Sequence, residues 1–154
     1  KCHHTIDPIP WRRQIGYVIQ KAGLLPHLTV KENISLLSKI LRKKENEITK
    51  RVEELMETIN MPYSKFAHRY PVELSGGQQQ RVAIARALIN SPAIIMGDEP
   101  TGNLDSKNTN IVFDVFKELA KERGQTIIAV THDDEFAANC DRIIELSDGK
   151  LISQ

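Results

Sequence analysis

Residues 74–81 read LSGGQQQR, so that a serine and two glycines stand directly before a run of strong helix formers. Ser75 occupies the position of a helix N-cap, and Gln78 completes a capping box three residues later. The free N–H groups of the first turn and the positive end of the helix dipole then point outward, and glycines without a Cβ let an anion approach the backbone. This stretch predicts a helix whose start faces phosphate.

The next apolar run, residues 93–97, ends on two adjacent carboxylates, Asp98 and Glu99. Pro92 bounds the run on its other side, and its length and composition are typical of a buried strand in a parallel sheet. In open α/β sheets, ligands sit at the carboxyl ends of such strands. Both carboxylates are therefore expected at a ligand-facing edge.

A second buried parallel strand is predicted at residues 126–131, and His132 stands at its carboxyl end. Between the two strands, residues 107–123 predict an amphipathic helix that Gly124 closes. Strand, helix and strand at this spacing form a crossover that brings the ends of two parallel strands together. We expect His132 to converge with the two carboxylates.

The other elements follow from local patterns. A β-rich run at residues 15–19 indicates a strand that ends on Gln20. A second capping box, formed by Thr29 and Glu32, opens another helix. This helix is expected to run through residues 33–41. An amphipathic helix is expected at residues 45–60, and a β-hairpin over residues 141–153 with Asp148-Gly149 at its turn.

Composition limits the class of protein. A chain of 154 residues, 40% hydrophobic and 27% charged, is typical of one soluble globular domain. Its 21 basic and 20 acidic residues leave a net charge of +1, so no nucleic-acid partner is expected. Cys2 and Cys140 have no metal-like spacing, which fits a reducing compartment, and His3-His4 beside Cys2 is better explained by a solvated loop than by a metal site. No apolar run approaches the roughly 20 residues that span a bilayer.

Five motifs together resemble the ATPases of the ATP-binding cassette (ABC) family, in the family's order. Gln20 is similar to the Q-loop glutamine, residues 74–78 to the signature motif, and residues 94–99 to the Walker B strand with its catalytic glutamate. Residues 102–105 resemble the D-loop, and His132 resembles the switch histidine. The Ser-Gly-Gly triplet alone would be a weak signal, whereas five motifs in order make a strong one.

The resemblance implies an α/β fold: a P-loop NTPase of the ABC type, with a partial RecA-like parallel sheet flanked by helices and an all-α helical subdomain. Residues 1–20 and 92–154 would form the RecA-like core, and residues 21–91 the helical subdomain with the signature motif. In the family, this subdomain and the Q-loop contact a transmembrane permease subunit, and two ATPase domains sandwich two nucleotides head to tail. The expected partners are therefore a permease and a second ABC ATPase, in a homodimer or a heterodimer.

ATP and Mg²⁺ are the implied cofactors, because hydrolysis must neutralise phosphate charge and orient a water molecule. Glu99 is predicted as the general base or water-orienting residue, and His132 as the contact to the γ-phosphate. Asp98 and Gln20 are predicted to hold Mg²⁺. The predicted nucleotide-binding residues are Gln20, Ser75, Gly76, Gly77, Gln78, Asn103 and Asp105. Each piece also has a structural explanation: Gln20 can simply end a strand, and a lone histidine at a strand end is more often structural than catalytic.

One motif departs from the family. A P-loop has the pattern Gly-x-x-x-x-Gly-Lys-Ser/Thr, and residues 1–154 contain no such segment. The phosphate-binding lysine, the backbone nest and the magnesium-binding hydroxyl that this loop supplies are therefore absent from this stretch. We expect a fragment that is inactive alone, with an apolar sheet edge and an apolar core face exposed.

Two functions remain open. The first is the Mg²⁺-dependent ATPase subunit of a bacterial ABC transporter, cytoplasmic and peripheral on the inner face of the membrane. The second is a non-catalytic partner that supplies its signature motif to a full-length homologue or a membrane complex. Residues 16–20 and 23–29 resemble osmoprotectant and amino-acid importers, whereas residues 98–106 resemble the lipoprotein-release, macrolide-export and cell-division group. The unbroken motif at residues 98–106 is longer than either of the two other pieces and favours the second group, but substrate choice belongs to other subunits.

Overall fold

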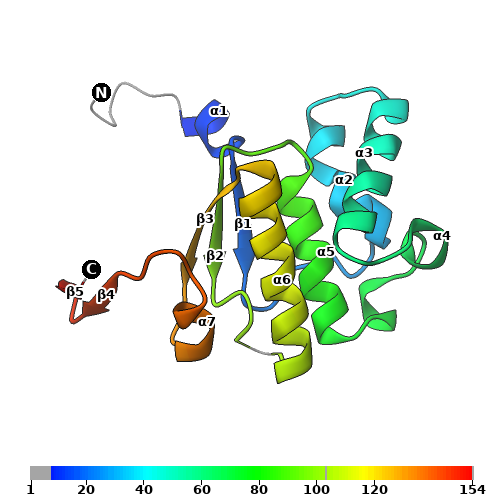
Figure 1. The fold of residues 1–154 in the computed structure, drawn as a ribbon. Coiled ribbons are helices and arrows are strands. Elements are labelled where there is room, and N and C mark those ends of the chain that lie inside the picture. Colours follow the sequence, from blue (N-terminus) through cyan, green and yellow to red (C-terminus); the bar gives the residue numbers. More distant parts are fainter. Residues whose placement is uncertain (1–7, 103, 154) are drawn as a thin grey trace.

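The computed structural model describes residues 8–102 and 104–153, and a parallel sheet with helices packed on one face forms its centre (Figure 1). The sheet has three strands in the order β1-β2-β3: β1 (Ile15–Ile19), β2 (Ile94–Asp98) and β3 (Thr126–Val130). Both neighbouring pairs are parallel, and for β2 and β3 this confirms the prediction from the crossover. Ile19 aligns with Asp98, which in turn aligns with Val130, so all three strands end at the same level.

Helices α5 (Gly76–Leu88) and α6 (Ser106–Arg123) cover one face of this sheet (Figure 1). The start of α5 is the predicted capping box: Ser75 Oγ accepts from the Gln78 backbone N–H, and Gln78 Oε1 accepts from the Ser75 N–H. Helix α5 packs so closely on β1 that a Cβ on Gly16 would lie 2.8 Å from the Ala87 carbonyl oxygen. Gly16 is therefore required for this contact.

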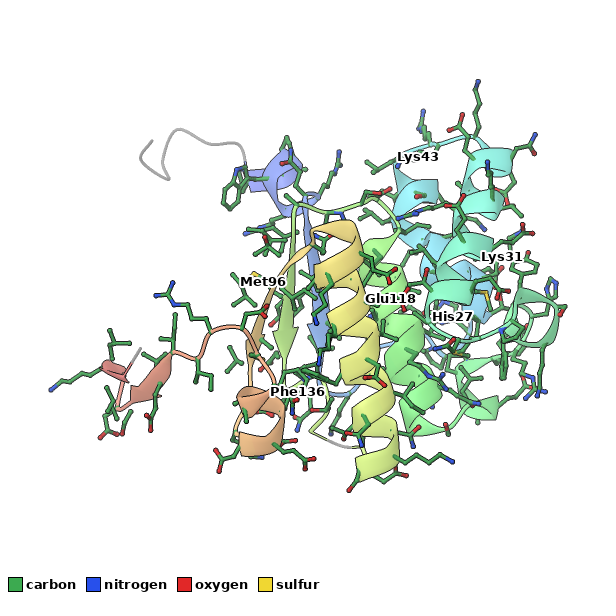
Figure 2. The ribbon with its side chains drawn as sticks, viewed as in Figure 1. His27, Lys31, Lys43, Met96, Glu118 and Phe136 are labelled. Carbon is green, nitrogen blue, oxygen red and sulfur yellow. The ribbon has the colours of Figure 1, made fainter. Side chains whose placement is uncertain are left out.

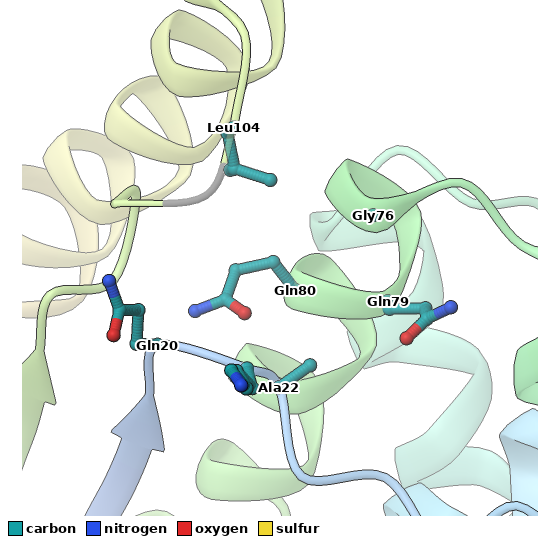
Figure 3. A pocket seen from close by; sticks show the side chains of 7 residues that line it. Gln20, Ala22, Gly76, Gln79, Gln80 and Leu104 are labelled. Carbon is teal, nitrogen blue, oxygen red and sulfur yellow. The ribbon is translucent and has the colours of Figure 1, made fainter.

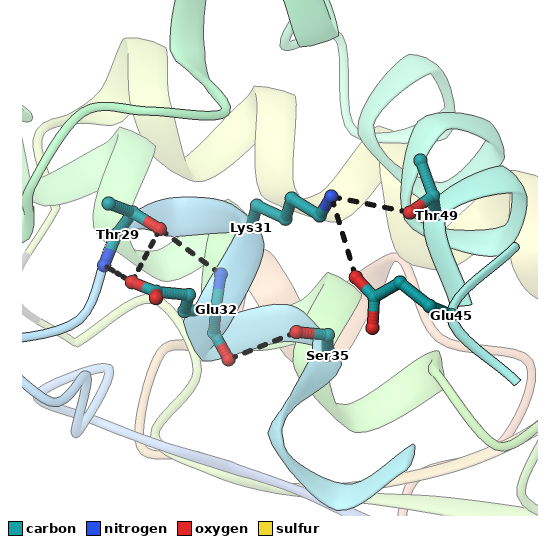
Figure 4. Close-up of polar contacts among 6 residues, drawn as sticks. All are labelled: Thr29, Lys31, Glu32, Ser35, Glu45 and Thr49. Atoms are coloured by element: carbon teal, nitrogen blue, oxygen red, sulfur yellow. Dashed lines mark hydrogen bonds and ion pairs between the residues drawn. The ribbon is translucent and has the colours of Figure 1, made fainter. Parts of the chain in front are cut away.

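A helical region lies on the other side of α5. It comprises α2 (Val30–Ile40), α3 (Glu45–Thr58), the short α4 (Tyr63–Phe66) and the 3₁₀ turn η2 (Pro71–Glu73). The predicted capping box of Thr29 and Glu32 begins α2, and Lys31 Nζ ties α2 to α3 through Thr49 Oγ1 at 3.2 Å and Glu45 Oε1 at 3.7 Å (Figure 4).

One apolar core runs through both sides of α5. It joins Val18 and Ile95 of the sheet to Ile34, Val52 and Met56 of α2 and α3. Because the core is continuous, packing alone draws no boundary near residues 20 or 91. The division into residues 1–20 with 92–154 and residues 21–91 therefore stays a prediction.

The opposite face of the sheet is open. Tyr17, Met96, Ile128 and Val130 point away from α5 and α6, and all four are exposed; Figure 2 shows Met96 on this side. The expectation that β3 is buried is wrong, because among the described residues no layer packs against this face or the free edge of β3. The expectation of an exposed apolar edge and core face is confirmed.

Several smaller elements complete the chain. Helices α1 (Pro8–Arg12) and α7 (Asp134–Ala138) were not predicted from the sequence. The predicted hairpin is present as β4 (Glu145–Ser147) and β5 (Lys150–Ser153), which project away from the sheet (Figure 1). Its first strand begins later than expected. None of the helices within the described ranges is long and apolar enough to span a bilayer.

Candidate functional site

The carboxyl ends of β2 and β3 bring Glu99 and His132 into direct contact. Glu99 Oε1 lies 2.7 Å from His132 Nδ1, and Thr131 Oγ1 lies 3.4 Å from Glu99 Oε2. The Glu99 side chain is 19% exposed, whereas that of His132 is 81% exposed. The pair therefore has an anchored carboxylate and an imidazole that faces solvent.

The backbone holds Glu99 in an unusual conformation. Its φ of 46° lies in the left-handed region, which residues with a side chain rarely adopt. The Glu99 N–H donates to the Val130 carbonyl at 2.9 Å, and the Glu99 carbonyl accepts from the Gly102 N–H at 3.1 Å. Two neighbouring segments thus fix a conformation that costs energy, a pattern that is common at functional sites.

The contact with Glu99 changes the protonation of His132. A hydrogen bond from the imidazole to the carboxylate, together with the negative charge of Glu99, raises the pKa of His132 above its usual 6.5. A carboxylate can only accept, so Nδ1 carries the proton in this pair. In the protonated ring, Nε2 is then available to donate to another oxygen.

Gln20 approaches the same place from β1. A Cβ on Gly102 would lie 2.8 Å from Gln20 Nε2 and 3.4 Å from Glu99 Oε2. Both side chains therefore border the space that Gly102 leaves open. A side chain at this position would displace the end of Gln20 from its present place.

Asp98 ends β2 directly before Glu99, and its side chain is exposed. Its register partner Ile19 precedes Gln20, so the two predicted magnesium ligands come from the ends of adjacent strands. Within the described ranges no cluster of three or more His, Cys, Asp or Glu side chains could hold a metal ion. The donor set fits Mg²⁺ in the way this ion is commonly bound, by one or two protein oxygens with the rest from phosphates and water.

The two glycines at the start of α5 have different surroundings, although the sequence analysis expected both to let an anion approach the backbone. Gly76 is open, with the Leu104 side chain 3.9 Å from the place of a Cβ. At Gly77, by contrast, a Cβ would collide with the side chain of Asn108 in α6. The missing Cβ at Gly77 therefore serves the packing of two helix starts, whereas at Gly76 it leaves the backbone accessible.

The loop between β2 and α6 contains two predicted nucleotide-binding residues. Asn103 lies outside the described residues. Asp105 is the N-cap of α6, where its Oδ1 accepts from the Asn108 N–H at 2.8 Å and from Asn108 Nδ2 at 2.9 Å. Asp105 thus has a structural role that accounts for its presence without a ligand.

A pocket of about 210 Å³ lies between the loop after β1 and α5, which begins in the signature motif and is called the signature helix below (Figure 3). Gln20, Lys21 and Ala22 line one side, and residues of α5 line the other. Among the latter, Gln80 is 2% exposed and donates to the Ile19 carbonyl at 3.0 Å. The predicted Q-loop and signature segments are therefore neighbours within this chain.

Sequence reasoning missed four residues of this region. The sequence pattern places Gly102 only in a loop and Thr131 only at the end of a strand. Gln80 and Arg86 on α5 fit the pattern of helix formers and so do not stand out, although a polar residue beside Ala83 and Ile84 on a buried face is a usable signal. Their partners are more than 60 residues away in the sequence, which explains the omission.

Comparison with known proteins gives consistent matches. The family described as ABC transporter matches residues 3–102. The carnitine transport ATP-binding protein OpuCA of Listeria monocytogenes is 47% identical over 147 residues, which cover 95% of this chain and 37% of the relative. The lipoprotein-releasing system ATP-binding protein LolD of Porphyromonas gingivalis is 43% identical over 142 residues, covering 92% and 64% of the two chains.

Solved structures agree with these matches. The ATP-binding cassette MJ0796, in a dimeric post-hydrolysis state bound to ADP and Pi, has a TM-score of 0.80 and 41% identity, over 96% of this chain and 66% of its own. The cbiO1 protein from Clostridium perfringens has a TM-score of 0.86 and 31% identity, over 94% and 58%. The chain thus spans little more than a third of its carnitine-transport relative, and the fold class predicted from the sequence is confirmed. The sequence match and the shared fold lead to one conclusion: this chain belongs to the ABC transporter family and corresponds to part of its ATP-binding subunit.

Proposed function

We propose that this chain is the part of an ATP-hydrolysing transporter subunit that supplies the catalytic carboxylate, the switch histidine and the signature helix. The observation that carries the proposal is the 2.7 Å contact of Glu99 Oε1 with His132 Nδ1 at the ends of adjacent strands. Such a pair combines a base that can accept a proton from water with a cationic donor for phosphate.

Each side chain has a role in this proposal. Glu99 orients the attacking water and takes up its proton, and the strained backbone of Glu99 aims the carboxylate. His132 is held by Glu99 through Nδ1 and donates from Nε2 to the γ-phosphate. Asp98 and Gln20 would hold Mg²⁺, which neutralises charge on the phosphates.

The start of α5 would bind the nucleotide of a second subunit. The N–H groups of Gly76 and Gly77 and the helix dipole attract phosphate. Ser75 Oγ accepts from Gln78 in the capping box, so its own proton is available to the same phosphate, and the Gln78 amide would flank it. Asn103 and Asp105 of the D-loop would border the nucleotide from the other side. The dimeric state of MJ0796 supports an assembly of two such chains.

The membrane partner and the location follow from the family. We propose that the Q-loop segment and the helical region contact a transmembrane permease subunit on the inner face of the membrane. Relatives named for carnitine transport and for lipoprotein release both match the chain. A pull-down that identifies the permease would distinguish the two kinds of system.

A second function rests on a specific observation. The start of α5 is fully formed, with its capping box closed and the backbone at Gly76 open. A chain of this kind could supply its signature helix to a full-length homologue without hydrolysing ATP in its own site.

The two functions are separated by a chimaera in which the P-loop segment of MJ0796 precedes residue 1. Under the first function, the chimaera hydrolyses ATP only with Mg²⁺, and Glu99→Gln lowers turnover by roughly a hundredfold or more while ATP still binds. Glu122→Gln, which removes an exposed carboxylate from α6, is the matched control and leaves turnover unchanged.

The catalytic assignment is wrong if the chimaera turns over ATP equally well with Glu99→Gln and with His132→Ala. If the chimaera binds ATP without hydrolysis but stimulates a homologue whose own signature motif is disabled, the second function is supported.

A further inference from the structure

We propose that Arg86 and Gln80 of α5 are positioning residues that fix the Q-loop turn, defined here as residues 19–23, and thereby hold Gln20 in place. The inference rests on the proposed function of Gln20 as a magnesium ligand. It adds direct hydrogen bonds between the signature helix and the turn that carries the proposed magnesium ligand of the same subunit.

Arg86 holds the end of the Q-loop turn with both arms of its guanidinium. Nη1 donates to the Gly23 carbonyl at 2.6 Å, and Nη2 donates to the Ala22 carbonyl at 2.7 Å. Burial lowers the pKa of Arg86, because the charged form is removed from water. Two short, charge-assisted hydrogen bonds in a fixed fork define both distance and orientation.

Gln80 holds the beginning of the same turn. It is buried, and Nε2 donates to the Ile19 carbonyl at 3.0 Å, which also accepts from the Ala22 N–H at 3.1 Å. The carbonyls of Ile19, Ala22 and Gly23 thus all bind side chains of α5. Gln20 and Lys21 lie between these fixed points.

The turn needs this support because its backbone is strained. Ala22 has a φ of 53° and Gly23 a φ of 54°, and a left-handed alanine is unfavourable. A side chain at Gly23 would be strained at this φ and would also bring its Cβ to 2.7 Å from the terminal methyl of Ile19, so glycine suits this position. Strained conformations persist only where surrounding contacts determine them, and here α5 supplies those contacts.

The geometry makes α5 and the turn one rigid unit. Helix α5 already touches β1 at Gly16, and the hydrogen bonds from Gln80 and Arg86 extend the contact past the end of the strand. The Gln20 side chain reaches from this unit toward Gly102 and Glu99. A displacement of the start of α5, at Gly76, would therefore also move Gln20.

Arg81 provides a matched control on the same helix. Its Nη1 also donates to two backbone carbonyls, of Ile59 at 3.2 Å and Asn60 at 3.4 Å, and burial also lowers its pKa. These carbonyls belong to the end of α3 and not to the Q-loop turn. Arg81 and Arg86 are therefore both partly buried cations bound to backbone carbonyls, but they hold different segments, and Arg81 uses one nitrogen where Arg86 uses two.

The test places a nitroxide spin label at residue 21 of the 154-residue chain, through Lys21→Cys with both native cysteines replaced by serine. Arg86→Gln should increase the mobile fraction of the label roughly threefold or more, because the turn loses its fork of two bonds. Arg81→Gln should leave the label spectrum unchanged. Arg86→Lys should be intermediate, because one ammonium does not reproduce the planar fork.

A second readout uses the P-loop chimaera. Arg86→Gln should raise the Mg²⁺ concentration for half-maximal hydrolysis roughly five- to tenfold, as expected when a ligand is less well held. Arg81→Gln should not change this concentration. If Arg86→Gln does not fold, Gln80→Met removes the other anchor at nearly constant volume and should mobilise the label in the same way.

Equal label mobility in Arg86→Gln and Arg81→Gln, or an unchanged label in Arg86→Lys and Gln80→Met, would overturn the inference. The label requires no ATP hydrolysis. An inactive chimaera would therefore count against the proposed function, while the spin-label result would still decide whether α5 fixes the turn.

Discussion

The helical region and the open face of the sheet contain the same kinds of apolar side chain in opposite environments. Three matched pairs show this: Met56 at 0% and Met96 at 38% exposure, Ile34 at 0% and Ile128 at 49%, Val52 at 0% and Val130 at 64%. In each pair the first residue lies in α2 or α3 and the second in β2 or β3. Residue type therefore does not decide burial in this chain.

The difference lies in whether a second layer is present. Helices α2 and α3 pack against α5, which also covers one face of the sheet, so their apolar stripes meet a partner. The far face of the sheet meets none among the described residues, although its side chains are as apolar as those of a core. Contiguous exposed apolar surface of this kind is typical of an interaction surface. Predictions on matched residues test this contrast.

The largest effect is expected at the methionine pair. Met56→Ala should lower the free energy of unfolding by about 2–5 kcal/mol, because it leaves a cavity in a closely packed core. Met96→Ala should lower it less, by about 1 kcal/mol, because Met96 is already 38% exposed and its loss leaves no closed cavity. Urea denaturation of both variants measures the difference. Similar losses at the two positions would mean that the open face is covered in solution.

A smaller effect is expected at the start of α2. Thr29→Ala should destabilise the chain by about 1 kcal/mol, because the N–H of Glu32 loses its acceptor in the capping box. Thr29→Ser keeps the hydroxyl and should restore most of the stability. Thermal denaturation of the two variants measures how much of the stability of the helical region comes from a local cap and how much from packing. If Thr29→Ala is as stable as the unmodified chain, the stability of the helical region comes from packing and not from this cap.

The smallest effect on stability is expected at the site itself. Because the pKa of His132 is raised, its pairing with Glu99 stabilises the fold fully below the unfolded pKa of about 6.5, and this contribution is lost as pH rises through the folded pKa. The imidazole is exposed, so the readout is an NMR titration of His132. Glu99→Gln should lower the midpoint clearly.

Asp133→Asn is the matched control for this titration. Asp133 raises the pKa of His132 through its charge alone, without a hydrogen bond to the ring, so its loss should lower the midpoint less than Glu99→Gln does. A midpoint that responds equally to both variants would contradict a direct bond between Glu99 and His132 in solution.

Local chemistry made much of the fold predictable. Capping boxes at Thr29 and Ser75 place the starts of α2 and α5, because their hydrogen bonds join residues only three apart. Gly124 ends α6 with a φ of 61°, and Asp148 and Gly149 form the hairpin turn with φ of 48° and 72°, as their residue types favour. Motif order identified the candidate site, and the contact between Glu99 and His132 followed from the parallel crossover.

The sequence by itself determined where the longer helices and the sheet strands begin and which carboxylates and histidine stand at strand ends, because periodicity, caps and turn residues act over a few positions. Only the tertiary structure decided that Gly77 is small to admit Asn108, that Asp105 caps a helix, and that β3 is exposed. It also decided that Arg86 and Gln80 bind the Q-loop turn. These outcomes depend on contacts between residues distant in the chain, and on whether a neighbouring layer is present, neither of which a local pattern contains.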